Sequence, residues 1–229
     1  MPHPLDNDLD NVQRLILCLA GLVEATLHKA IQALIHRDIP LAREVISTEG
    51  QIDEEETHVN EECLNILSQN NPDETSLRKI AATMMIVVDL ERMGDLAEEI
   101  AESAIEVAKE VSVPVPLDIA NVAELTRAMV RESLDAFVKT DVKLARRVHG
   151  KDQQVDELTE VILTELRERM KESPEYVNPA LSLYDAVQRL ERIADHATNI
   201  AESALYLAQG EIVRHRPGAL YRDDDDDDD

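Results

Sequence analysis

The chain has 229 residues and a formal net charge of −25, which includes seven consecutive aspartates at its C-terminus. A chain this acidic is repelled by nucleic acid and by anionic membrane surfaces, so neither is an expected partner. No signal peptide is visible, and the longest uninterrupted apolar run, residues 80–88, is too short to cross a bilayer. We therefore expect a cytoplasmic protein without membrane insertion.

Proline and N-cap signals divide the chain into helical segments. Aromatic residues make up only 2% of the chain, and its six glycines are sparse, which favours helices over sheets. Asp38 and Asp141 each precede a Leu-Ala-Arg run, as N-cap residues do. Pro40 fits the first turn of its helix, and further prolines interrupt the chain near residues 72, 114 and 174. We predict an all-α protein with six helices over 5–36, 39–69, 74–111, 117–139, 142–172 and 180–210.

The second half of the chain repeats the first. LERMGDLAEEIAESA (residues 90–104) and LERIADHATNIAESA (residues 190–204) are identical at most positions, at a spacing of 100 residues. Residues 38–45 match residues 141–148 at a spacing of 103. These matches indicate a tandem duplication, and three helices joined by short loops must run up, down and up. We predict two spectrin-like three-helix bundles and a disordered acidic tail, over 5–112, 117–210 and 216–229 respectively.

Carboxylates four residues apart occur at equivalent positions in both copies. If the second and third helices of each bundle are adjacent, each copy collects four carboxylates, which then need cations, basic side chains or protonation. Ligand sets made only of oxygen suit hard cations or an oxygen-bridged iron or manganese cluster. We therefore predict a divalent or transition-metal site in each repeat, with iron, manganese, zinc and magnesium as candidates. The predicted ligands are Glu49, Asp53, Glu91 and Asp95 in the first repeat and Asp152, Asp156, Glu191 and Asp195 in the second.

Helical periodicity places the acids of the third helices away from the core. Met93 and Ile100 belong to a predicted apolar stripe, and Glu91 and Asp95 lie nearly opposite to it. A simpler interpretation stays open, in which these acids are ordinary surface residues, because acids at such spacing are common on solvated helix faces. Arg92 and its counterpart Arg192 could also neutralise the neighbouring acids.

Few other residues suggest chemistry. His196 points to a different helix face from the pair beside it, so packing or hydrogen bonding is favoured over metal ligation. His58 is expected on the surface, and Cys18 and Cys63 are expected to be buried free thiols. The sequence has no nucleophile elbow or glycine-rich phosphate cradle, and we predict no catalytic centre.

The repeated motifs resemble a known family. DLERMGD (residues 89–95) and LERIADHATNIAE (residues 190–202) resemble the paired signatures of the PhoU family of phosphate-uptake regulators, and residues 61–67 and 210–215 are also similar to it. The resemblance implies two similar three-helix bundles and multinuclear metal clusters on the same acidic motifs. One departure is Ser76, which stands where the family usually has an aspartate.

The resemblance also implies a function. It indicates a cytoplasmic, non-catalytic adaptor, expected as a homodimer, that restrains phosphate uptake and phosphate-starvation gene expression. Its implied partners are the ATPase subunit of a phosphate ABC transporter and a sensor histidine kinase. The alternatives are a metal-storage or redox protein and a purely structural scaffold. The only Glu-x-x-His pair, Glu55 to His58, has no second copy, which argues against the redox function.

Overall fold

The computed structural model describes residues 4–69, 71–109 and 113–210, and the regular structure of these residues is entirely helical. This confirms the all-α prediction. The predicted acidic tail lies outside the described residues, as do residues 110–112 at the predicted end of the first bundle. The helices are α1 (Pro4–His36), α2 (Ile39–Ile46), α3 (Glu49–Gln69), α4 (Glu74–Lys109), α5 (Asp118–Lys139), α6 (Val142–Glu172), the 3-10 turn η1 (Pro174–Tyr176) and α7 (Val177–Gln209).

The first loops of the two repeats have the same structure. Arg37 and Thr140 adopt positive φ angles of 55° and 51°, the left-handed conformation that ends a helix. The residue after each is the predicted N-cap. The carboxylates of Asp38 and Asp141 accept hydrogen bonds from the backbone N–H groups of Leu41 and Leu144, each at 3.0 Å.

The predicted second helix is interrupted in the first repeat and continuous in the second. The helix over 39–69 breaks at Ser47–Thr48 into α2 and α3, whereas α6 has no break. The hydroxyls of Ser47 and Thr48 both donate to the carbonyl oxygen of Glu44, at 2.7 and 3.0 Å, and so compete with the helical hydrogen bonds. Gly150 and Lys151 occupy the equivalent places in α6 and have no hydroxyl to do this.

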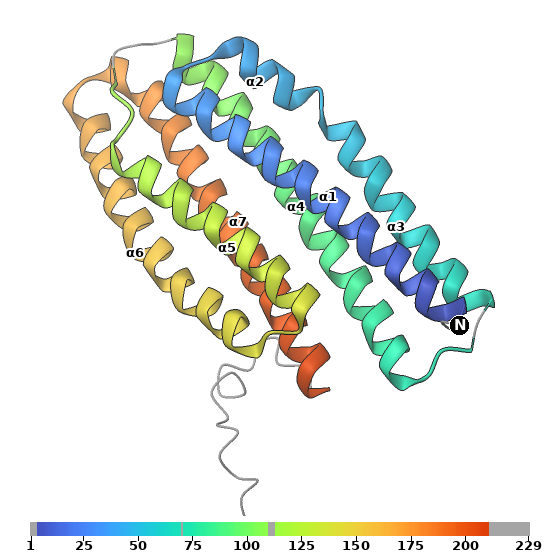
Figure 1. Cartoon of the computed structure of the whole chain (residues 1–229). Coiled ribbons are helices and arrows are strands. Elements are labelled where there is room, and N and C mark those ends of the chain that lie inside the picture. The colour runs from blue at the N-terminus through green and yellow to red at the C-terminus, as the bar shows by residue number, and fades with distance from the viewer. Residues whose placement is uncertain (1–3, 70, 110–112, 211–229) are drawn as a thin grey trace, which may run out of the picture.

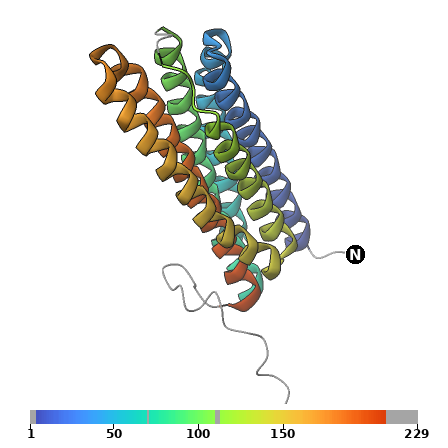
Figure 2. The ribbon, with the colours of Figure 1, turned by 90° about the vertical axis from the view of Figure 1, so that its left-hand side faces the viewer.

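The helices form two bundles that lie side by side. Helices α1 to α4 pack together, as do α5 to α7, and the two groups meet mainly where α4 packs against α7 and α1 against α5. Figure 1 shows α3 and α6 at the two outer sides, with α4 and α7 between them, and Figure 2 shows all the long helices running along one common direction. A single apolar core runs through both bundles. The predicted stripe residues Met93 and Ile100, and their counterparts Ile193 and Ile200, are all fully buried in it.

Three details differ from the sequence-based expectations. Helix α7 begins at Val177 rather than residue 180, because Pro179 is tolerated within the first turn, where N–H groups have no helical partner. Cys63 is buried as predicted, but Cys18 is exposed, and both are free thiols. Helix α1 is apolar enough by length and composition to qualify as a candidate membrane span. Here its apolar face, with Leu19, Val23 and Leu27 fully buried, forms part of the bundle core, and core helices of bundles pass the same test.

Candidate functional site

The first acidic cluster lies at the start of α3, just after the break in the predicted second helix. Glu49 is the first residue of α3, and Asp53 lies one turn later on the same face. Asp95 on α4 faces them, and one oxygen from each of the three carboxylates can be chosen so that all lie within 4.8 Å of one another. Glu49 and Asp53 are exposed and Asp95 is half-buried. Three of the four ligands predicted for this repeat are therefore brought together.

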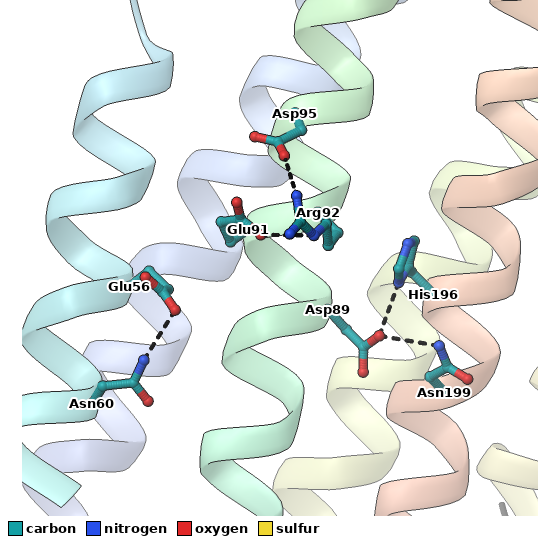
Figure 3. Close-up of polar contacts among 8 residues, drawn as sticks. All are labelled: Glu56, Asn60, Asp89, Glu91, Arg92, Asp95, His196 and Asn199. Atoms are coloured by element: carbon teal, nitrogen blue, oxygen red, sulfur yellow. Dashed lines mark hydrogen bonds and ion pairs between the residues drawn. The ribbon is translucent and has the colours of Figure 1, made fainter. Parts of the chain in front are cut away.

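The fourth predicted ligand, Glu91, lies one turn before Asp95 on α4 and is held by an arginine. Burial raises the pKa of Glu91, the Asp95 charge raises it further, and Arg92 acts in the opposite direction. The Arg92 guanidinium pairs with both acids, with its Nε 3.4 Å from a Glu91 oxygen and an Nη 2.9 Å from an Asp95 oxygen (Figure 3). In this repeat, then, arginine neutralisation of the kind anticipated from the sequence does occur.

The second acidic cluster lies between α6 and α7. Burial raises the pKa values of Asp152, Glu191 and Asp195, and the charge of Asp156 is the next largest cause for each of the three. All four predicted ligands of this repeat therefore repel one another, although among the described residues only the first cluster brings three carboxylate oxygens within 4.8 Å of one another. His196 and then Arg192 act to lower the pKa of Asp195, but within the described part of the chain Arg192 forms no ion pair.

Three residues near these clusters were not anticipated. Burial, and then the charges of Glu49, Glu102 and Asp95, raise the pKa of Glu98, which adds a further acid to the first cluster. In the second cluster, the Thr198 hydroxyl and His149 act to lower the pKa of Asp152. Positions 98 and 198 are equivalent in the two repeats but carry a glutamate and a threonine. Only acids present in both copies were predicted as ligands, so Glu98 and Thr198 were not predicted. Their positions, three residues after Asp95 and Asp195, place them on the same helix faces and could have indicated them.

The predicted acids of α4 are also less exposed than expected. The side chains of Glu91 and Asp95 are 20% and 31% exposed, because α4 is covered by α1, α2, α3 and α7 and has little free surface. They line the contact between α3 and α4 rather than an open face. An oxygen-only donor set of partly desolvated, mutually repelling carboxylates fits a hard divalent cation, which would compensate their charge.

A separate polar contact connects the two bundles. Asp89 on α4 is only 4% exposed. One of its oxygens lies 2.8 Å from Nδ1 of His196 and accepts a hydrogen bond of 3.0 Å from the Asn199 amide, both on α7. Figure 3 shows that Asp89 points toward α7, whereas Glu91 lies on the side of α4 toward α3. The predicted hydrogen-bonding role of His196 is confirmed. The burial of Asp89 was not predicted, although it follows Ile86 by three residues and precedes Met93 by four, the spacing of one helix face.

Comparison with known proteins agrees with this architecture. The PhoU domain family model matches the chain twice, over residues 16–104 and 119–204. A phosphate-specific transport system accessory protein PhoU homolog from Pseudomonas putida is 38% identical over 209 residues, covering 91% of this chain and 82% of the relative. A homolog from Aquifex aeolicus is 38% identical over 212 residues, covering 93% and 96%.

Solved structures show the same fold. The crystal structure of PhoU from Pseudomonas aeruginosa matches with a TM-score of 0.86 at 36% identity, over 90% of this chain and 99% of that chain. The phosphate transport system regulatory protein PhoU from Streptococcus pneumoniae matches with a TM-score of 0.86 at 28% identity, over 91% and 99%. The two domain matches, the relatives and the shared fold together place this chain in the PhoU family.

Proposed function

We propose that this protein is a non-catalytic, cytoplasmic regulator that restrains phosphate uptake and phosphate-starvation signalling. The observation that carries the proposal is the double PhoU domain match, in a chain similar along nine-tenths of its length to accessory proteins of phosphate-specific transport systems. Family membership supports an accessory role in phosphate transport. The direction of regulation and the partners are part of the proposal.

The shape and charge of the molecule suit an adaptor. Helices of about 30 residues are about 45 Å long, so the paired bundles offer extended faces to two partners at once. The partners we propose are the ATPase subunit of a phosphate ABC transporter and a sensor histidine kinase, and we propose that the protein acts as a homodimer. A net charge of −25 favours basic surfaces on those partners, since opposite charge speeds encounter.

A deletion strain tests the regulatory proposal. In phosphate-rich medium, loss of the gene should leave a phosphate-starvation reporter switched on and phosphate uptake unrestrained, and the parent gene should restore both. Normal repression and normal uptake in the deletion strain, with no second PhoU gene present, would contradict the proposal. Binding of the purified protein to the ATPase subunit should also weaken as salt rises if charge contributes to the contact.

A second proposal concerns the acidic clusters: we propose that each repeat binds a divalent or transition-metal cluster through its four predicted ligands. In the first repeat, the placement of one oxygen each of Glu49, Asp53 and Asp95 within 4.8 Å of one another supports it. A bound cation would neutralise the carboxylates and connect α3 to α4 in the first repeat, and α6 to α7 in the second. A positive ion at these points suits a structural or regulatory role.

Metal content tests the second proposal. Protein purified without chelator should contain metal, and Asp53→Asn with Asp95→Asn should lower the content of the first cluster. Asp156→Asn with Asp195→Asn should do the same for the second. Glu54→Gln with Glu157→Gln is a matched control, because these exposed acids occupy equivalent positions one residue beyond the proposed ligands. Equal metal content in parent, variants and control would rule out the site.

A further inference from the structure

The contact between α4 and α7 is reciprocal. Arg189 on α7 pairs with Glu99 on α4, with its Nε 2.5 Å from a carboxylate oxygen. Asp89 on α4 accepts a hydrogen bond from Asn199 on α7. At the repeat spacing of 100, positions 89 and 189 are equivalent, and so are positions 99 and 199. The two contacts therefore join the same two positions in both directions, as in a twofold interface.

The residues at these equivalent positions are chemically opposite. Position 89/189 is a carboxylate in the first repeat and a guanidinium in the second. Position 99/199 is a carboxylate in the first repeat and an amide in the second. In each contact a donor therefore meets an acceptor, although the two repeats share most of the surrounding sequence.

The contact between α1 and α5 follows the same rule. At the upstream spacing of 103, Glu24 is equivalent to Arg127, and both line one small depression of about 70 Å³ together with Arg131. Burial raises the pKa of Glu24, while the charges of Arg131 and Arg127 act to lower it. Opposite charges therefore line the same depression between the bundles, although the ion pair of Arg127 is with Glu124 on its own helix, at 2.7 Å.

Pairing two identical repeats would bring like charges together at these positions. Two first repeats, from two copies of the chain, would set Asp89 against Glu99 and Glu24 against Glu24. Two second repeats would set Arg127 against Arg127. Because Asp89 is almost fully buried, water could not relieve its repulsion from a second carboxylate.

The apolar part of the interface does not distinguish like repeats from unlike repeats. Buried residues of α4 such as Ala97, Ile100 and Ala104 are identical to their counterparts Ala197, Ile200 and Ala204 in α7. Apolar packing of such similar faces would accept like or unlike repeats. Selectivity between such partners comes from polar groups that are satisfied in one pairing and unsatisfied in the other.

We propose that opposite charges at equivalent positions make this interface selective for unlike repeats, so that a first repeat accepts a second repeat and rejects another first repeat. The second repeat is supplied by the same chain, or by another copy when chains exchange repeats. Any dimer formed through this surface must then be an exchanged one.

Reversing one charge tests the proposal in the full-length chain. Glu99→Arg sets the introduced guanidinium against Arg189 within the chain. It also makes the first repeat complementary to itself, because Asp89 of one copy would meet the introduced guanidinium of another. After unfolding and refolding at high protein concentration, sedimentation velocity should show a larger fraction of species heavier than the main species of the parent. The thermal midpoint should fall by about 2–4 °C, the shift expected for losing one such interaction in a chain of this length.

Two further variants identify the cause. Adding Arg189→Glu restores an ion pair within the chain, so the parent midpoint and sedimentation profile should return. Adding Asp89→Asn to Glu99→Arg removes the new self-complementarity, so the fraction of heavier species should fall. Glu61→Arg makes the same charge change at an exposed position of α3 and is the control. The proposal is overturned if Glu99→Arg behaves as Glu61→Arg does, or if Arg189→Glu restores neither property.

Discussion

The two acidic clusters contain the same pattern of carboxylates in two different electrostatic settings. In the first, Arg92 pairs with both Glu91 and Asp95. In the second, three of the four predicted ligands have raised pKa values, and within the described residues Arg192, the counterpart of Arg92, forms no ion pair with any of the four. The arginine ion pairs of the first cluster are therefore not repeated in the second.

This difference separates two roles that one motif can have. A carboxylate cluster held by its own arginine is already partly neutral and gains less from a cation. In a cluster without such a partner the carboxylates repel one another, and a bound cation or a proton would relieve this repulsion. We therefore expect the second cluster to respond more strongly to metal, to acid and to neutralising substitutions.

Metal loading should give the largest effect. A divalent cation present at a hundred times its dissociation constant should stabilise the folded chain by about 2.7 kcal/mol per site. Asp156→Asn with Asp195→Asn should remove more of this gain than Asp53→Asn with Asp95→Asn, because the second cluster lacks an arginine partner. The measurement is thermal unfolding of chelator-treated and metal-loaded protein. Equal losses from the two pairs of substitutions would contradict the asymmetry.

The next effect concerns the helix contact beneath each cluster. A Cβ added at Gly94 would lie 2.8 Å from Cδ1 and 3.1 Å from Cγ2 of Ile52 on α3. The equivalent contact in the second repeat is Ala194 against Val155, so a larger residue on one helix is matched by a smaller one on the other. Gly94→Ala should therefore destabilise by about 1 kcal/mol, because overpacking outweighs the higher helix propensity of alanine.

Introducing the residue types of the second repeat at both positions should restore the stability. Adding Ile52→Val to Gly94→Ala removes the Cδ1 atom, and the stability should return to within about 0.5 kcal/mol of the parent. Gly150→Ala is the control, because nothing lies within 4 Å of a Cβ at that exposed position, and it should stabilise by up to about 1 kcal/mol. Urea unfolding measures all three variants, and a Gly94→Ala chain as stable as the control would show that Ile52 simply moves aside.

The sequence predicted the fold more completely than it predicted the sites. Helix periodicity, the N-caps at Asp38 and Asp141, and the internal repeat were sufficient for two three-helix bundles, because each is a local or self-matching signal. The break at Ser47–Thr48 depends on two hydroxyls competing for one carbonyl, which residue type alone does not determine. Asp89 and Glu98 were not predicted because their counterparts, Arg189 and Thr198, differ, and only acids present in both copies were predicted as ligands.

A smaller effect should distinguish the two arginines. Arg92→Gln removes a partner of both Glu91 and Asp95 and should destabilise the metal-free protein by about 0.5 kcal/mol, within the range of exposed ion pairs. Arg192→Gln should have a smaller effect, because Arg192 influences Asp195 without forming an ion pair. Urea unfolding at neutral pH measures the difference. A larger loss for Arg192→Gln would show that the second cluster depends on its arginine after all.

The smallest effect is a pH dependence, and its sign follows from the raised pKa values. The carboxyls of Asp152 and Glu191 have ordinary pKa values of 3.8 and 4.5, and both are higher in the folded protein. Between the ordinary and the folded values, the folded state binds more protons than the unfolded state. The free energy of unfolding contributed by the second cluster therefore falls as pH rises through this window, and the loss is complete above the folded pKa values.

Neutralising Asp156 isolates this contribution from the other titrating groups of the metal-free protein. Asp156→Asn removes the charge that most raises the three neighbouring pKa values. At about pH 7 it should stabilise by about 0.5 kcal/mol, the scale of like-charge repulsion on helices. The gain should vanish as the pH falls to about 3, where the carboxyls are largely protonated in both states. Asp53→Asn should gain less at neutral pH, because Arg92 compensates the first cluster. Urea unfolding across this pH range measures both variants, and a gain for Asp53→Asn that equals or exceeds that for Asp156→Asn would remove the proposed difference between the repeats.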